Sequence, residues 1–189
     1  MDPRGNLYVP HAVDIRDNLK KLFTFAKEHE IKILSSIDAH TVGDEEFQHF
    51  PPHCVKETEG VQKIDITKCK DSVVIENIKQ PITRSLLNRQ QIIVEKQSLD
   101  IFDNVNTDNI VRSLNIECCV VFGVATDYCV KAAALGLHKR KYTVYLVTDA
   151  VKPFTSVGEK VALDTLRSAG TIFISTDAVL EEDYQQRFK

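Results

Sequence analysis

Several features that define large classes of proteins are missing from the 189-residue sequence. The net charge is -3 and there is no basic face, which argues against binding of nucleic acid or anionic lipid. No apolar run approaches the roughly 18 residues that a membrane-spanning helix needs. The opening residues, MDPRGNLYVP, also lack the basic start and apolar stretch of a signal peptide. We therefore expect a cytoplasmic protein with no nucleic-acid or membrane partner.

The cysteines also lack the patterns typical of disulfide frameworks and zinc fingers. There are five, an odd number, and no two are separated by two residues. Cys118 and Cys119 lie in the apolar run CCVVF, where burial as small hydrophobic side chains is expected. Cys129 differs, because it follows an apolar strand at the start of a predicted helix.

What the sequence does contain is an alternation of two hydrophobic periods. Apolar residues at helical spacing predict helices, and short apolar runs predict strands between them. The alternation predicts a parallel sheet covered by helices on both faces. We expect an α/β fold with a doubly wound, Rossmann-like parallel sheet, in a single domain spanning residues 1–189. The predicted helices are 18–30, 106–115, 127–140 and 156–170, and the predicted strands are 31–38, 91–96, 118–123, 142–148 and 171–176.

The stretch between residues 41 and 90 is less regular. Its first part is polar and interrupted by prolines, and its second part predicts at most a short strand and a helical turn. Such a length without clear periodicity is typical of a functional loop.

Polar side chains follow three of the predicted strands. Asp38 and His40 follow the strand at 31–38, Lys96 ends the strand at 91–96, and Cys129 follows a third strand. In open parallel sheets, ligands bind at the carboxyl ends of the strands. We therefore expect these side chains to share one cavity. A carboxylate, an imidazole, an amine and a thiol are the groups that a covalent hydrolase needs.

The position of Cys129 fits a nucleophile and a buried structural thiol equally well. If Asp127 or Thr126 caps the predicted helix, Cys129 lies in its first turn, where the helix dipole favours a thiolate. A nearby ammonium group, that of Lys96, would lower the thiol pKa further. Small residues in the turn, such as Gly123, let backbone N–H groups approach an oxyanion, which favours the nucleophile.

A second group of polar residues lies in the run SIDAHTVGDEEFQHFPPHC. Asp38, His40 and His53 supply one carboxylate and two imidazoles, which suit a divalent metal such as zinc, iron or manganese with open positions for water and substrate. In a single loop, however, such residues are more often exposed to solvent than bound to metal. His49 is a spare imidazole that we expect at the surface.

The run GVATDYCV resembles the nucleophile turn of the nicotinamidase and isochorismatase-like cysteine hydrolases, which reads Gly-Val-Ala-Thr, an acid, an aromatic residue and Cys-Val. The runs DPRGNLYVPHA, VEKQSLDIF and LVTDAV resemble other segments of that family, so the resemblance covers nearly the whole chain. It implies the isochorismatase-like hydrolase fold, with Cys129 as nucleophile and Lys96 as catalytic lysine. It also implies a cis peptide between Val124 and Ala125, and an oxyanion hole formed by the N–H groups of Ala125 and Cys129.

The resemblance also addresses the metal. Nicotinamidases have Asp-x-His followed by His-Cys-Val, which implies that Asp38, His40 and His53 bind a metal, with zinc favoured over iron or manganese. The turn that follows reads KETEG, so Glu57 replaces the usual glycine. Isochorismatases typically lack this trio, so the nicotinamidase branch is favoured. The implied reaction is hydrolysis of nicotinamide or a similar small amide through a cysteine thioester, in NAD metabolism. Relatives are often dimers or tetramers, which implies a homo-oligomer.

One family residue has no counterpart in the sequence. Family members begin with an apolar strand that carries the catalytic aspartate, and this sequence begins just beyond it; Asp2 aligns with the following loop, whereas Asp14 and Asp17 fall on the first helix. Without that central strand, a sheet of order 3-2-1-4-5-6 would have two unpaired interior edges. One explanation is that the recorded start is an internal methionine and an upstream segment carries the strand. The alternatives are that this segment was lost, or that another segment fills its place, which would leave a weak enzyme or a non-catalytic member that binds a metal and a small ligand. An isochorismatase-type hydrolase, which does not need the cysteine, is a further alternative.

Overall fold

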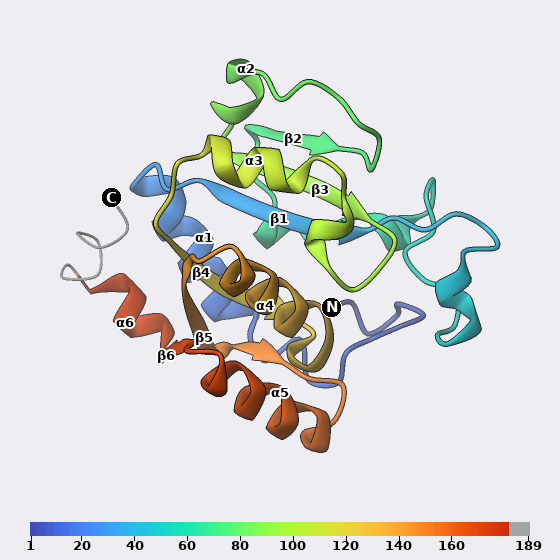
Figure 1. Ribbon diagram of the computed structural model, residues 1–189. Coiled ribbons are helices and arrows are strands. Elements are labelled where there is room, and N and C mark those ends of the chain that lie inside the picture. The colour runs from blue at the N-terminus through green and yellow to red at the C-terminus, as the bar shows by residue number, and fades with distance from the viewer. Residues whose placement is uncertain (182–189) are drawn as a thin grey trace. The chain divides into compact units, whose positions relative to one another are not determined.

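The computed structural model describes residues 1–181, which form two compact units. The first unit comprises Met1–Tyr8 and Lys32–Asn115, and the second comprises Val9–Ile31 and the chain from Ile116 onward. Each unit contains a three-stranded parallel sheet and its own helices (Figure 1). The single-domain organisation expected from the sequence stays a prediction.

The sheet of the first unit has the order β1-β3-β2. Its strands are β1 (Ile33–Asp38), β3 (Gln91–Lys96) and β2 (Ser72–Ile75). The central strand β3 is the most buried, since it has a strand on each side and residues 92–94 are at most 2% exposed. The parallel register pairs Asp38 with Lys96, so these two side chains end neighbouring strands.

The helices of the first unit are short. They are α2 (Arg84–Leu87) and α3 (Thr107–Ser113), and four 3-10 turns accompany them: η1 (Glu45–Gln48), η2 (Glu59–Val61), η3 (Asp65–Thr67) and η4 (Ile101–Asp103). Helix α3 is amphipathic and buries Ile110 and Val111. Most of the 3-10 turns lie between residues 41 and 90, where the sequence predicts little regular structure.

The sheet of the second unit has the order β4-β5-β6. Its strands are β4 (Cys118–Val124), β5 (Thr143–Lys152) and β6 (Ile172–Ile174), and its helices are α1 (Arg16–Glu28), α4 (Lys131–Lys139), α5 (Ser156–Ser168) and α6 (Thr176–Leu180). The middle of β5, residues 144–147, is buried because it is the central strand of this sheet. Helix α1 buries a stripe of apolar residues at helical spacing, which includes Leu19, Leu22 and Phe23.

The α/β class with parallel strands is confirmed, and every predicted strand and helix has a counterpart within a few residues. The strands do not form one sheet, however. Strands β1 and β4 are each an edge strand of their own sheet.

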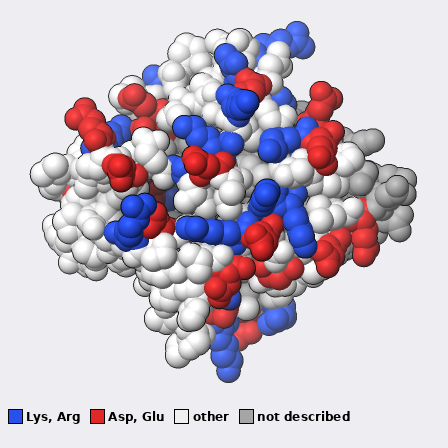
Figure 2. All heavy atoms as spheres, turned by 180° about the vertical axis from the view of Figure 1, so that it is seen from behind, with Lys and Arg blue, Asp and Glu red and all other residues white. Residues whose placement is uncertain are grey.

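The distribution of charged side chains on the surface agrees with the small net charge of the sequence. On the face drawn in Figure 2, acidic and basic side chains are interspersed, and neither sign forms a continuous field. Among residues 1–181, no helix has both the length and the apolar character needed to cross a membrane.

Candidate metal centre and nucleophile turn

Two histidines that are distant in the sequence meet beside the end of β1. The backbone N–H of His40 donates to the carbonyl of Cys54 (3.0 Å), and the N–H of Lys56 donates to the carbonyl of His40 (2.9 Å). These bonds form a parallel bridge between His40 and Val55. The bridge draws the proline-containing loop back against β1, so the rings of His40 and His53 lie with their centroids 4.7 Å apart.

Hydrogen bonds hold both rings in the same tautomer. The Nδ1 atom of His53 lies 2.9 Å from the carbonyl of Pro51, which can only accept, so this nitrogen carries the proton. The Nδ1 atom of His40 lies 3.1 Å from the carboxylate of Asp44, which is also an acceptor. In the neutral imidazoles, each Nε2 atom would then carry the lone pair. That of His40 is fully buried and has no hydrogen-bond partner among the described residues.

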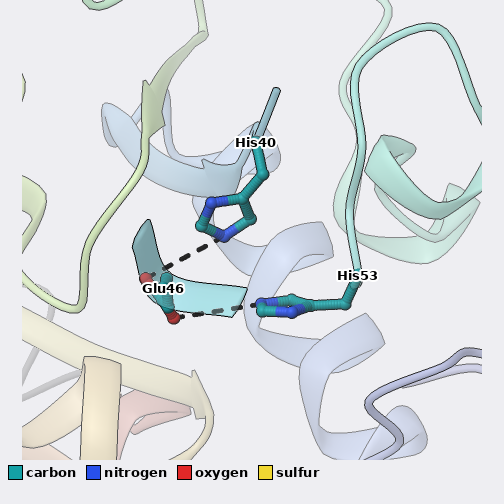
Figure 3. A group of neighbouring side chains, drawn as sticks. All are labelled: His40, Glu46 and His53. Atoms are coloured by element: carbon teal, nitrogen blue, oxygen red, sulfur yellow. Dashed lines mark ion pairs between the residues drawn. The ribbon is translucent and has the colours of Figure 1, made fainter. Parts of the chain in front are cut away.

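Glu46 faces both lone pairs (Figure 3). One of its carboxylate oxygens lies 4.0 Å from Nε2 of His40, and the other lies 4.0 Å from Nε2 of His53. The three ligating atoms lie within 4.8 Å of one another. Around tetrahedral zinc, ligand atoms would be about 3.4 Å apart for bonds of about 2.1 Å, so a small inward shift would suffice. Two histidines and one glutamate form a donor set that suits a divalent metal with an open position.

The surroundings of this cluster favour a bound cation. The ring of Phe47 packs against those of His40 and His53, with centroid distances of 5.2 and 5.8 Å, and the histidines are 0% and 5% exposed. An unpartnered imidazole nitrogen in such apolar surroundings is costly unless it binds something. The pKa of the Asp44 carboxyl is lowered: burial acts to raise it, but hydrogen bonds from His40 and the N–H of Glu46 outweigh burial. Asp44 thus stays ionised beside His40.

The structure places Asp38 outside this cluster. Its carboxylate forms an ion pair with Lys96, whose Nζ also donates to the carbonyl of Ser98 (2.7 Å). The Lys96 side chain is 2% exposed, and that of Asp38 is 28% exposed. The sequence predicted that Asp38 and Lys96 lie at one sheet edge, as observed. The assignment of Asp38 to the metal stays a prediction, and Glu46, which the sequence did not single out, faces the two histidines instead.

Asp44 is expected to support the metal through His40. Replacing Asp44 by alanine should lower the zinc affinity of the protein roughly 10–100-fold, because His40 would lose the acceptor that fixes its tautomer and ring orientation. Competition with a chromophoric zinc chelator measures this. The neighbouring Glu45, which is exposed and outside the cluster, provides the control. An Asp44→Ala affinity equal to that of Glu45→Ala would contradict the prediction.

Glu57, which stands where the family resemblance implies a glycine, has a backbone conformation that favours glycine. Glu57 has a φ of 68°, in the left-handed region that favours glycine. We therefore expect Glu57→Gly to raise the free energy of unfolding by about 1 kcal/mol relative to the original protein, because the strain imposed by the Cβ atom disappears. Urea unfolding measures the change. Glu59→Gly in η2, where φ is not positive, should lower the unfolding free energy instead.

The predicted nucleophile lies in the second unit, in a π turn (Thr126–Val130) between β4 and α4. Strand β4 changes register at Gly123, whose φ of 121° requires a glycine, and the peptide bond between Val124 and Ala125 is cis. The N–H groups of Tyr128 and Val130 both donate to the carbonyl of Ala125, each at 3.1 Å. Cys129 thus lies between two amides that are tied to one carbonyl. Single π turns occur frequently at functional sites.

The structure corrects the predicted helix cap. Ala125 precedes the turn, and no side chain caps it; the carboxylate of Asp127 accepts instead from the backbone N–H groups of Phe154 and Thr155. The side chain of Thr126 is buried, and its hydroxyl has no partner among the described residues.

The cysteines of strand β4 have a different character from a reactive thiol. Burial raises the pKa of Cys118, and burial together with the neighbouring Cys118 raises the pKa of Cys119 to about 12. Because the thiolate is the attacking species, these thiols are poor nucleophiles. None of the five cysteines forms a disulfide.

Comparison with known proteins identifies the family. The isochorismatase domain matches residues 3–178, so the chain belongs to the isochorismatase family. Among characterised relatives, the nicotinamidase of Saccharomyces cerevisiae is 28% identical over 70% of this chain, and the match spans 62% of the yeast protein. The nicotinamidase of Escherichia coli K12 is 25% identical, with 78% of this chain and 76% of that protein covered.

Solved structures show the same relationship. The pyrazinamidase of Pyrococcus horikoshii in complex with zinc has a TM-score of 0.75, 26% identity and 92% coverage of each chain. An isochorismatase-like hydrolase from Alkaliphilus metalliredigens has a TM-score of 0.77 at 22% identity, covering 95% of this chain and 90% of that chain, and supports the fold alone. The isochorismatase-like hydrolase fold predicted from the sequence is confirmed.

Proposed function

We propose that the chain hydrolyses nicotinamide or a similar small aromatic amide to the acid and ammonia, with Cys129 as the nucleophile. One observation carries the proposal: two buried imidazoles present their Nε2 lone pairs to Glu46, in a chain that belongs to the isochorismatase family and is similar to nicotinamidases. The metal-binding residues favour the nicotinamidase branch over the isochorismatase branch.

In the proposed reaction, the thiolate of Cys129 attacks the carboxamide carbon, and the thiol proton leaves with ammonia. Water then hydrolyses the thioester and regenerates the thiol. The N–H groups of Ala125 and Cys129 are assigned to the oxyanion of each tetrahedral intermediate. Lys96 is assigned the role of the family's catalytic lysine, with Asp38 as its ionic partner.

His40, Glu46 and His53 would hold the metal. A metal bound there would supply a Lewis acid for the pyridine nitrogen of the substrate. Zinc is proposed because histidine and carboxylate donors suit it, and because the similar Pyrococcus pyrazinamidase is a zinc complex; iron and manganese are the alternatives. The homo-oligomeric state and the cytoplasmic location expected from the sequence stay predictions.

The test is ammonia release from nicotinamide by the purified protein. We expect release that falls after treatment with a chelator and returns when zinc is added. A protein that binds zinc and nicotinamide but releases no ammonia would be a binding member of the family. Ammonia release that is unaffected by complete thiol alkylation would exclude Cys129 as nucleophile.

A further inference from the structure

A buried carboxylate ties the nucleophile turn to a distant part of the second unit. Asp127, two residues before Cys129, is 7% exposed. Its Oδ1 atom accepts from the N–H of Phe154 (3.0 Å), and its Oδ2 atom accepts from the N–H of Thr155 (3.3 Å). Both amides stand just before α5, at the positive end of a 13-residue helix, which offsets the cost of burying the charge.

Gly158 provides the space for this carboxylate. A Cβ atom added to Gly158 would overlap Oδ2 of Asp127, and it would lie 3.0 Å from the Cβ of Asp127 and 2.8 Å from Oγ1 of Thr155. Gly158 is the third residue of α5 and does not have a positive φ, so its backbone does not require glycine. A helix interior favours alanine over glycine by about 1 kcal/mol. The glycine is therefore explained by the positions of the Asp127 carboxylate and, to a lesser degree, the Thr155 hydroxyl.

A second contact joins the same two segments. The rings of Tyr128 and Phe154 pack edge to face, with centroids 5.4 Å apart. Within the turn itself, the N–H groups of Tyr128 and Val130 share the carbonyl of Ala125, and the N–H of Lys131 donates to the carbonyl of Tyr128. The hydrogen bonds of Asp127 and this ring pair therefore both join the nucleophile turn to the segment before α5.

We infer that Asp127 is a positioning residue, which holds the nucleophile turn against the start of α5 in the space that Gly158 leaves open. The inference rests on the role proposed for Cys129. A displacement of about 1 Å at a reacting group can lower the rate by roughly 10²-fold, so a turn that carries both the nucleophile and oxyanion N–H groups needs such a tether.

Two substitutions test the tether from opposite sides. Asp127→Ala removes the carboxylate, and Gly158→Ala displaces it while improving the intrinsic helix propensity of α5. Each is expected to lower kcat for nicotinamide roughly 10–100-fold, with KM changed less than about 3-fold. The double variant should lose much less than the product of the two single losses, because the overlap with the carboxylate disappears and only the closer contacts with Oγ1 of Thr155 and Cβ of residue 127 remain. Additive losses in the double variant would overturn the inference.

Two controls separate positioning from the stability of the helices. Thr155→Ala removes the cap hydroxyl of α5, which accepts from the N–H of Gly158 (2.9 Å), and leaves Asp127 in place. Asp149→Ala removes a comparable contact, since its Oδ1 atom accepts from the N–H of Thr176 (2.7 Å) at the start of α6. Both should lower the unfolding temperature and leave kcat unchanged. If Thr155→Ala lowered kcat as much as Asp127→Ala does, the effect of Asp127 would be explained by stabilisation of α5. That result would overturn the inference.

Hydrogen exchange gives a readout that does not depend on activity. Amides in residues 124–131 should exchange faster in Asp127→Ala and Gly158→Ala than in the original protein, and at an unchanged rate in Thr155→Ala. The milder Asp127→Asn serves if Asp127→Ala does not fold. Unchanged exchange in the Asp127 variants would overturn the inference. If the original protein releases no ammonia but the exchange rates follow this pattern, the proposed function fails while the tether stands.

Discussion

Replacing Cys129 by alanine is expected to lower ammonia release from nicotinamide by roughly 10⁴-fold or more, as loss of a covalent nucleophile does in other hydrolases. In the proposed reaction, the thiol forms the bond that carries the acyl group, so we expect no other residue of the turn to replace it. The initial rate of ammonia formation, measured at saturating zinc, gives the loss of kcat.

The matched control for Cys129→Ala is Cys119→Ala. Cys119 lies on β4, only ten residues before Cys129, but its pKa of about 12 keeps the thiol protonated at neutral pH. Its replacement is expected to leave kcat within about 3-fold of the original value. Both variants should retain the zinc affinity of the original protein, because neither cysteine belongs to the histidine cluster. Substantial turnover by Cys129→Ala would favour hydrolysis by water without a thioester.

The sequence predicted well those elements whose burial produces a regular pattern of hydrophobic residues along the chain. Strand β3 is buried along most of its length and reads as a continuous apolar run, and α1 buries one face at helical spacing. The short elements α6 and η1 carry too few residues to show a period, and they were not predicted. The placement of Asp38 and Lys96 at one sheet edge followed from the rule that the carboxyl ends of parallel strands meet there.

The proposed metal ligands show where sequence reasoning ends. Asp44, Glu45 and Glu46 are consecutive acidic residues, and nothing in their order tells which one faces the histidines. The 3-10 turn that begins after Asp44 decides this: it directs Glu46 toward the cluster and leaves Glu45 exposed. The acidic run between the two candidate histidines was the available signal for Glu46. The Asp-x-His spacing of Asp38 and His40 favoured Asp38 as the ligand instead.

The contacts of Asp127 were missed for a similar reason. Its position after a strand fits a helix cap, and its actual partners lie 27 and 28 residues further along the chain. Such a contact depends on how α5 returns beside the turn, which local sequence does not encode. Gly158 was the available signal, because a glycine near the start of an otherwise regular helix needs a reason in the packing around it.

The assignment of Glu46 in place of Asp38 leads to the second large expected effect. Glu46→Gln should lower zinc affinity by at least the roughly 10–100-fold that loss of a supporting hydrogen bond costs, because it removes a charged ligand. Asp38→Asn should leave the affinity within about 3-fold, since Asp38 is paired with Lys96 and stands outside the cluster. Competition with a chromophoric chelator measures both.

Two exposed neighbours supply matched controls for these variants. Glu45→Gln makes the same change of charge one residue away, and His49→Ala removes an exposed imidazole in place of the buried His53. Neither should alter zinc affinity, whereas His53→Ala should lower it at least as much as Glu46→Gln does. If Asp38→Asn weakens zinc binding as strongly as Glu46→Gln, Asp38 must leave Lys96 when the metal binds. The ligand set expected from the family resemblance would then hold, with Glu46 as a fourth donor.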